Sequence, residues 1–144
     1  MAEKLFTGEQ KARIKEAIRD AEKNTSGEIR VHIDRKCKAD VLDRAAYVFE
    51  QLNMHKTKLR NGVLIYLATD DHKFAILGDA GINTVVPDNF WDDIKDRMLE
   101  NFKQGKFTEG LEEGIRMAGQ QLEKHFPYQI DDENELDDEI SFGK

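Results

Sequence analysis

Residues 63–77 read V-L-I-Y-L-A-T-D-D-H-K-F-A-I-L, and this stretch decides the fold. Its first six residues are apolar on both faces and rich in β-formers, which is typical of a strand in the middle of a sheet. A polar turn follows at 69–72, and residues 73–77 form a second β-rich run. Two such runs joined by so short a turn indicate a hairpin, so we expect antiparallel strands over 63–68 and 73–77.

A third strand is predicted upstream, at residues 28–34. Its apolar residues alternate with polar ones, and this period of two indicates a half-buried strand; they are Ile29, Val31 and Ile33. Asp40 is a suitable N-cap for a helix that follows, with an apolar stripe of Leu42, Ala45, Ala46, Phe49 and Leu52. Because a helix connects them, we expect strands 28–34 and 63–68 to be parallel, with a right-handed crossover.

Three more helices are predicted from apolar residues at helical spacing. Thr7 and Gln10 form a capping box before a helix over about 8–23. Asp88 and Thr108 are suitable N-caps for two further helices, whose stripes are Trp91, Ile94, Met98 and Phe102, and Leu111, Ile115, Ala118 and Leu122. Three glycines in the last helix, Gly110, Gly114 and Gly119, predict close packing against a neighbour. Four amphipathic helices and a small mixed sheet predict a three-layer α/β/α sandwich.

The chain has 144 residues, which is the usual size of one domain. We expect that domain to span 1–127. Seven acids and one lysine fall in residues 128–144, so this segment carries −6 of the net charge of −7. We expect it to be a disordered acidic tail, because its charges repel one another and it has little apolar surface to bury.

Composition also excludes several classes of protein. No apolar run reaches the length of about 18 residues that a transmembrane helix needs, and the first ten residues do not resemble a secretory signal, so we expect a cytoplasmic protein. The nearly neutral domain offers no basic surface for nucleic acid. With Cys37 as its single cysteine, the chain cannot form an internal disulfide. A P-loop, a G-x-S-x-G elbow and an H-E-x-x-H motif are all absent.

Carboxylates and an amide remain as candidate ligands. Strand polarity places Glu28, Asn61 and Asp79 at one end of the sheet, and the loop and helix after Asp79 can return there. That helix would add oxygen ligands from Asp92 or Asp93. Such oxygens suit Ca²⁺, or Mg²⁺ as the alternative, so we predict a divalent-metal site of Glu28, Asn61, Asp79, Asp92 and Asp93. In the other interpretation, Glu28 and Asp79 cap turns or pair with Arg30 or Arg60.

The opposite end of the sheet holds a second group of polar residues: Asp34, Asp70, Asp71 and His72. Asp70 and Asp71 are most simply the turn of the hairpin. A second carboxylate cluster at this end is the alternative.

Five segments, taken in their order along the chain, resemble the TPM domain family. They are T-S-G-E-I at 25–29, N-G-V-L-I-Y at 61–66, G-D-A-G-I at 78–82, F-W at 90–91 and F-K-Q-G-K-F-T-E-G-L at 102–111. The resemblance spans about residues 5–126 and implies an α/β sandwich. Its recurrent positions correspond here to Glu28, Asn61, Gly62, Asp71, Asp79 and Gly81. Where many members carry arginine after the turn aspartate, this chain has His72.

The resemblance also implies a function. Members of the family have been described as phosphatases, including an acid phosphatase of the thylakoid lumen, and some are reported to hold a divalent cation, especially calcium. The chain is most similar to the soluble, stand-alone bacterial branch. We therefore expect a calcium-binding domain with an interaction or regulatory role and an unidentified protein partner. The alternative is a metal-dependent acid phosphatase acting on phosphate monoesters. The sequence shows no clear nucleophile for that reaction, and Arg60 is the only nearby arginine that could bind the phosphate.

Overall fold

The structure, a computed structural model, describes residues 5–128 and 139–143. Its sheet has four strands in the order β3-β2-β1-β4. The strands are β1 (Glu28–Asp34), β2 (Gly62–Ala68), β3 (Lys73–Gly78) and β4 (Ser141–Phe142). The helices are α1 (Gly8–Glu22), α2 (Val41–Gln51), α3 (Ala80–Asn83), α4 (Asp92–Lys103) and α5 (Phe107–His125), with a single 3₁₀ turn at Met54–Lys56.

The register of the central strands confirms the predicted topology. β1 and β2 are parallel, pairing from Glu28 with Gly62 to Asp34 with Ala68. β2 and β3 are antiparallel around the 69–72 turn. The capping box of α1 is also present, because Thr7 and Gln10 each accept a backbone N–H of the other.

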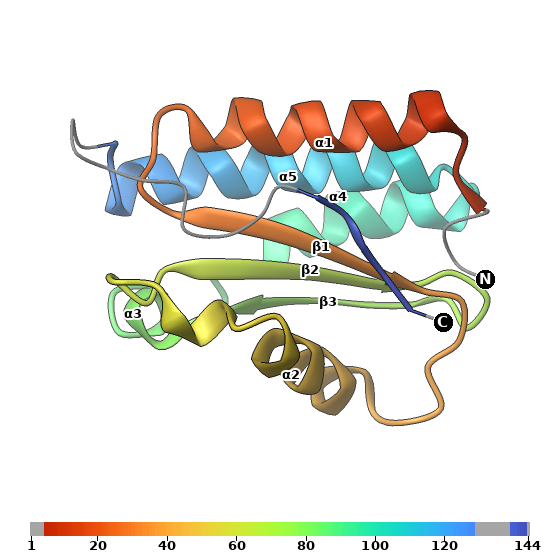
Figure 1. The fold of residues 1–144 in the computed structure, drawn as a ribbon, viewed down its shortest axis with the longest axis horizontal. Helices are drawn as coiled ribbons and strands as arrows, with labels where there is room; N and C mark the ends of the chain where they lie inside the picture. The colour runs from red at the N-terminus through yellow and green to blue at the C-terminus, as the bar shows by residue number, and fades with distance from the viewer. Residues whose placement is uncertain (1–4, 129–138, 144) are drawn as a thin grey trace.

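Helices cover both faces of the sheet, so the predicted α/β sandwich is confirmed (Figure 1). On one face α1, α4 and α5 pack on the alternate residues of β1 and β2 that include Val31 and Ile65. On the other, α2 packs on Leu64, Tyr66 and Ala75. The three glycines of α5 lie where neighbours approach closely, facing Phe102, Met98 and Ala21 in turn. A Cβ at Gly119 would press on the backbone of Ala21, whereas one at Gly110 or Gly114 would displace the side chain of Phe102 or Met98.

Some element boundaries differ from the predicted ones. α4 begins at Asp92 rather than after Asp88, and α5 begins at Phe107, so Thr108 is a buried helical residue and not the cap. The loop expected after Asp79 begins with the short helix α3, which Asp79 caps. β1 is buried along both faces instead of one, since its polar residues His32 and Asp34 are enclosed in hydrogen bonds.

The C-terminal residues add an unexpected strand. We expected a disordered tail over 128–144; residues 129–138 and Lys144 lie outside the described part, but residues 139–143 are ordered. Ser141 and Phe142 pair in parallel with His32 and Ile33 at the outer edge of β1 (Figure 1). These residues form a strand because two apolar side chains of the acidic segment, Ile140 and Phe142, pack on the main core. In addition, Lys15 binds Glu139, with their charged atoms 2.7 Å apart.

Among the described residues, the helices are too short or too polar to cross a membrane.

Candidate functional site

Three of the five predicted metal ligands meet at one end of the sheet. Glu28 opens β1, and its N–H donates to the carbonyl of Asn61 at 3.4 Å. The N–H of Asp79 donates to the carbonyl of Gly62 at 3.0 Å, which brings the end of β3 to the same place. All three side chains are buried, with Glu28 3%, Asn61 1% and Asp79 6% exposed. The pairing of the strands therefore places the backbone of these three residues at one end of the sheet, and their role as metal ligands stays a prediction.

The carboxylate of Asp79 already has strong partners. Arg60 donates to both of its oxygens, at 2.7 and 2.8 Å, and the N–H of Ala80 donates to one of them at 2.7 Å. This is the alternative considered from the sequence, in which Asp79 caps a turn and pairs with Arg60. The side chain of Arg60 is 48% exposed, so the cation that neutralises Asp79 sits at the surface.

Asp92 and Asp93 are placed differently. Both are exposed in the first turn of α4. The preceding residue, Trp91, packs over Gly78 on the face of the sheet that carries α4, whereas Asp79 opens into a cavity on the α2 face. The structure therefore does not bring these two carboxylates to the other three. Nowhere in residues 5–128 or 139–143 are three His, Cys, Asp or Glu side chains arranged to hold a metal ion.

The cavity beside Asp79 has a volume of about 440 Å³. Besides Arg60 and Asp79, its polar lining comes from Glu50, His55 and Asn83. Glu50 and His55 were not predicted as site residues, because they belong to α2 and a polar loop that no local motif connects to Asp79. Asn83 is held nearby, since its side-chain amide donates to the carbonyl of Gly78 at 3.1 Å.

At the opposite end of the sheet, Asp34 is the centre of a buried hydrogen-bond network. Its carboxylate accepts from Tyr66 at 2.5 Å and from Arg44 at 3.0 and 3.4 Å. His32 Nε2 lies 2.9 Å from it, and His32 Nδ1 lies 2.8 Å from the hydroxyl of Ser141 on β4. The imidazole also stacks on the ring of Tyr66 at 5.8 Å between centroids. The network thus ties β1, β2, α2 and β4 together.

These contacts fix the charge of the network. Burial alone would raise the pKa of Asp34, but hydrogen bonds from His32, Arg44 and Tyr66 outweigh it and hold that pKa well below its ordinary value. Burial, together with the hydrogen bond to Asp34, raises the pKa of the Tyr66 hydroxyl. Asp34 is therefore a stable anion whose lone pairs are already used, which suits it to holding other groups in place.

The hairpin turn supports the neighbouring loop, residues 35–40. The side chain of Asp71 accepts from the N–H of Cys37 at 2.7 Å, and the N–H of Asp70 donates to the carbonyl of Arg35 at 2.7 Å. Lys73 donates to the carbonyl of Cys37 at 3.0 Å. The carboxylate of Asp70 accepts from the guanidinium of Arg35 at 3.2 Å. Asp70 and Asp71 are thus turn residues whose carboxylates each have a donor, rather than two open ligands of one ion.

This loop forms one wall of an open cavity of about 1160 Å³ at the carboxyl end of β1. Four cations line it, Arg35, Lys36, Lys38 and Arg44, against two carboxylates, Asp34 and Asp70. The surplus of positive charge contrasts with the net −7 of the whole chain. Crevices beyond the carboxyl ends of strands are where ligands bind in open α/β sheets, so this cavity can hold an anion.

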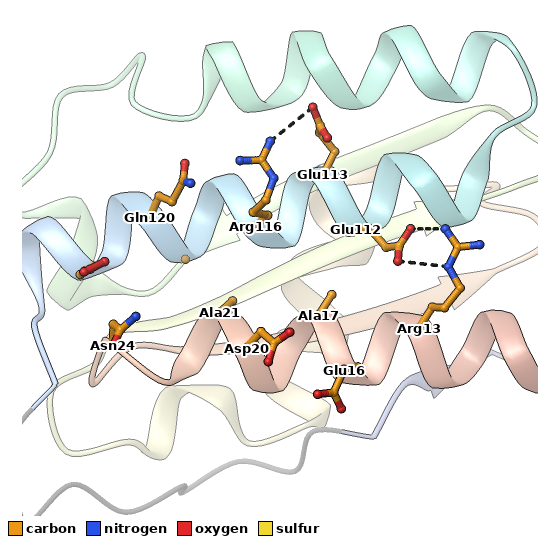
Figure 2. A pocket seen from close by; sticks show the side chains of 12 residues that line it. Arg13, Glu16, Ala17, Asp20, Ala21, Asn24, Glu112, Glu113, Arg116 and Gln120 are labelled. Atoms are coloured by element: carbon orange, nitrogen blue, oxygen red, sulfur yellow. Dashed lines mark hydrogen bonds and ion pairs between the residues drawn. The ribbon is translucent and has the colours of Figure 1, made fainter.

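A further groove lies between α1 and α5, with a volume of about 480 Å³ (Figure 2). Its floor includes Ala17 and Ala21. Arg13 spans it to Glu112, donating at 2.5 and 3.2 Å, and so links the two helices. The groove therefore marks the close approach of α1 and α5, and it is built from other elements than the two sheet ends.

Residues 2–121 match the sequence profile of the TPM domain. The chain belongs to the TPM domain family. A comparison with curated proteins found no match.

Solved structures agree with this family. The BA42 protein of the psychrophilic bacterium Bizionia argentinensis is 54% identical, with a TM-score of 0.91 over 96% of this chain and 95% of that one. The N-terminal domain of a P. gingivalis protein is 25% identical, with a TM-score of 0.69 over 85% of this chain and 79% of that one. The N-terminal domain of cg2496 from Corynebacterium glutamicum, at 14% identity and a TM-score of 0.65, covers 81% and 74% and shows the shared fold.

Within this TPM domain, sequence reasoning missed the cationic cavity. Its charges are spread over a loop and a helix, and no short motif marks them. One signal was available, because Arg35, Lys36 and Lys38 form a basic run directly after the predicted strand 28–34. A basic run at the carboxyl end of a parallel strand is a position where an anion site is expected.

Proposed function

We propose that this TPM domain binds a divalent cation, calcium first, at the sheet end formed by Glu28, Asn61 and Asp79, and that the cation serves an interaction or regulatory role. The observation that carries the proposal is the position of these three buried, oxygen-bearing residues at the same end of the sheet. Carboxylate and amide oxygens are the ligands that Ca²⁺ prefers, and its tolerance of irregular geometry suits a site built at strand ends better than the octahedron of Mg²⁺.

The residues fit such a cation on one condition. Arg60 now neutralises Asp79, so a metal ion would have to displace a guanidinium that is 48% exposed. The remaining oxygens would come from Glu50, Asn83, main-chain carbonyls or water, since Asp92 and Asp93 lie on the other side of the sheet. Arg60 therefore acts as a built-in competitor for the ion.

This competition gives a sharp test by NMR titration of the ¹⁵N-labelled chain with Ca²⁺ and Mg²⁺. Shifts should concentrate at Glu28, Asn61 and Asp79. Asp79→Asn should weaken binding, whereas Arg60→Gln should tighten it. Arg97→Gln is the matched control, because Arg97 is a similarly exposed arginine paired with Glu113 on the helical layer. No response at millimolar calcium, or shifts confined to other residues, would exclude this site.

A second candidate function, the binding and metal-dependent hydrolysis of phosphate monoesters, is favoured by one observation. The cavity at the carboxyl end of β1 carries a surplus of cations, as a phosphate site requires. Titration with inorganic phosphate should shift Lys36 and Lys38, and Lys36→Glu or Lys38→Glu should abolish the effect. Lys124→Glu, at the exposed end of α5, is the control. An assay of p-nitrophenyl phosphate hydrolysis with and without Ca²⁺ or Mg²⁺ then separates an enzyme from a binding domain.

A further inference from the structure

The cationic cavity is too large for a phosphate group alone. Its volume of about 1160 Å³ slightly exceeds the range of about 300–1,000 Å³ that is typical of sites for whole small organic molecules. A bound phosphate would leave most of this space to water. The rest of the lining therefore bears on what the phosphate is attached to.

Of the four cationic side chains that line the cavity, two are paired with carboxylates and two are not. Arg35 pairs with Asp70 at 3.2 Å, and Arg44 pairs with Asp34 at 3.0 Å. Lys36 and Lys38 are exposed and have no ion-pair or hydrogen-bond partner among the residues that the structure describes. Two available ammonium groups match the charge of one phosphate monoester, which is close to −2 at neutral pH. They belong to the loop that follows β1, where the hairpin turn holds the backbone (Figure 1).

The wall opposite this loop comes from one face of α2. Arg44, Tyr47 and Gln51 line the cavity, and their spacing of three and four residues places them on the same side of the helix. The ring of Tyr47 is 55% exposed and takes no part in the core. The guanidinium of Arg44 lies 5.5 Å from its centroid. A planar aromatic surface therefore stands beside the cationic loop, with the amide of Gln51 one turn further along the helix.

We propose that this cavity binds a nucleoside monophosphate, with the phosphate held by Lys36 and Lys38 and the base stacked on Tyr47. Every nucleobase has a flat π-face that stacks on an aromatic side chain, and the amide of Gln51 offers both a donor and an acceptor to the edge of such a base. A sugar phosphate would use the lysines but has no base to stack on the exposed ring of Tyr47. The proposal rests on the phosphate-binding candidate above and names the class of compound that carries the phosphate.

The test titrates the full ¹⁵N-labelled chain with four probes: AMP, ribose 5-phosphate, adenosine and inorganic phosphate. AMP should bind at least about 5-fold more tightly than ribose 5-phosphate, which is the lower end of what stacking one base supplies. Its shifts should include Lys36, Lys38 and Tyr47. Tyr47→Ala should reduce AMP to the affinity of ribose 5-phosphate, whereas Tyr47→Phe should retain the difference. Both substitutions are at an exposed ring, and the NMR spectrum reports directly whether each variant is folded.

The outcomes separate the two proposals. If phosphate and ribose 5-phosphate bind at the lysines but AMP binds no more tightly, the nucleotide proposal fails and phosphate-ester binding stands. If none of the phosphorylated probes shifts Lys36 or Lys38, both fail. If AMP binds elsewhere, or if Tyr47→Ala leaves its advantage intact, the base is not on Tyr47 and the proposal is again overturned.

Discussion

Replacing Gly81 with alanine should destabilise this domain severely, because the connection after β3, here the short helix α3, crosses the loop before β2 at that residue. The N–H of Gly81 donates to the carbonyl of Arg60 at 2.8 Å. A Cβ added at Gly81 would lie 2.1 Å from the carbonyl oxygen of Leu59 and 2.6 Å from that of Arg60. Both atoms belong to the backbone and cannot rotate away. Inserting even a methyl group into such a contact costs about 1–3 kcal/mol, occasionally more, and we expect a loss of at least about 3 kcal/mol.

Urea denaturation followed by circular dichroism measures this effect. A loss of that size is a large part of the about 5–15 kcal/mol that stabilises a typical domain, and it should lower the melting temperature by about 6–12 °C for a chain of this length. Gly8→Ala is the matched control, because Gly8 opens α1 with no atom near its added Cβ. That variant should be unchanged or stabilised by less than about 1 kcal/mol. A Gly81→Ala protein as stable as Gly8→Ala would mean that the two connections do not cross as described.

Three further predictions concern stability. Trp91→Ala should cost about 3–5 kcal/mol in urea denaturation, since Trp91 is only 7% exposed; a near-neutral result would place the indole at the surface. Phe142→Ala should cost about 1–2 kcal/mol, less than a fully buried ring, because Phe142 of β4 is only half-buried against the core; an unchanged midpoint would show that β4 contributes nothing. Asp34, whose folded-state pKa is held below the usual value of about 3.9, stabilises the fold above about pH 4 and loses that contribution as the pH falls toward its folded pKa. Asp34→Asn should therefore flatten the fall in stability below about pH 4, and a slope equal to that of the natural protein would contradict the assignment.

The sandwich could be predicted from the sequence because local patterns of residues identify most of its strands and helices. The 63–77 hairpin carries its turn and both strands in fifteen consecutive residues, and periodicity defines α1, α2 and the stripes of α4 and α5. β4 could not be found in this way. It has two residues within a strongly acidic segment, and only contact with β1 and α1 makes Phe142 a strand residue.

The candidate site shows the same division. Strand polarity was enough to group Glu28, Asn61 and Asp79, since it follows from the order of elements alone. It could not place Asp92, because α4 lies on the opposite face from the Asp79 side chain, and a linear pattern does not reveal on which side of a sheet a later helix packs. The sequence alone also could not show which partner Asp79 has. Its pairing with Arg60, 19 residues away in the chain, depends on how the connections before β2 and after β3 cross.

The outer edge of β1 has a consequence for how the protein is made. The imidazole of His32 meets the hydroxyl of Ser141 across 109 positions of sequence. During synthesis, β1 and β2 can therefore pair long before residues 141–142 leave the ribosome, and for that interval the β1 edge is open to strands of other nascent chains.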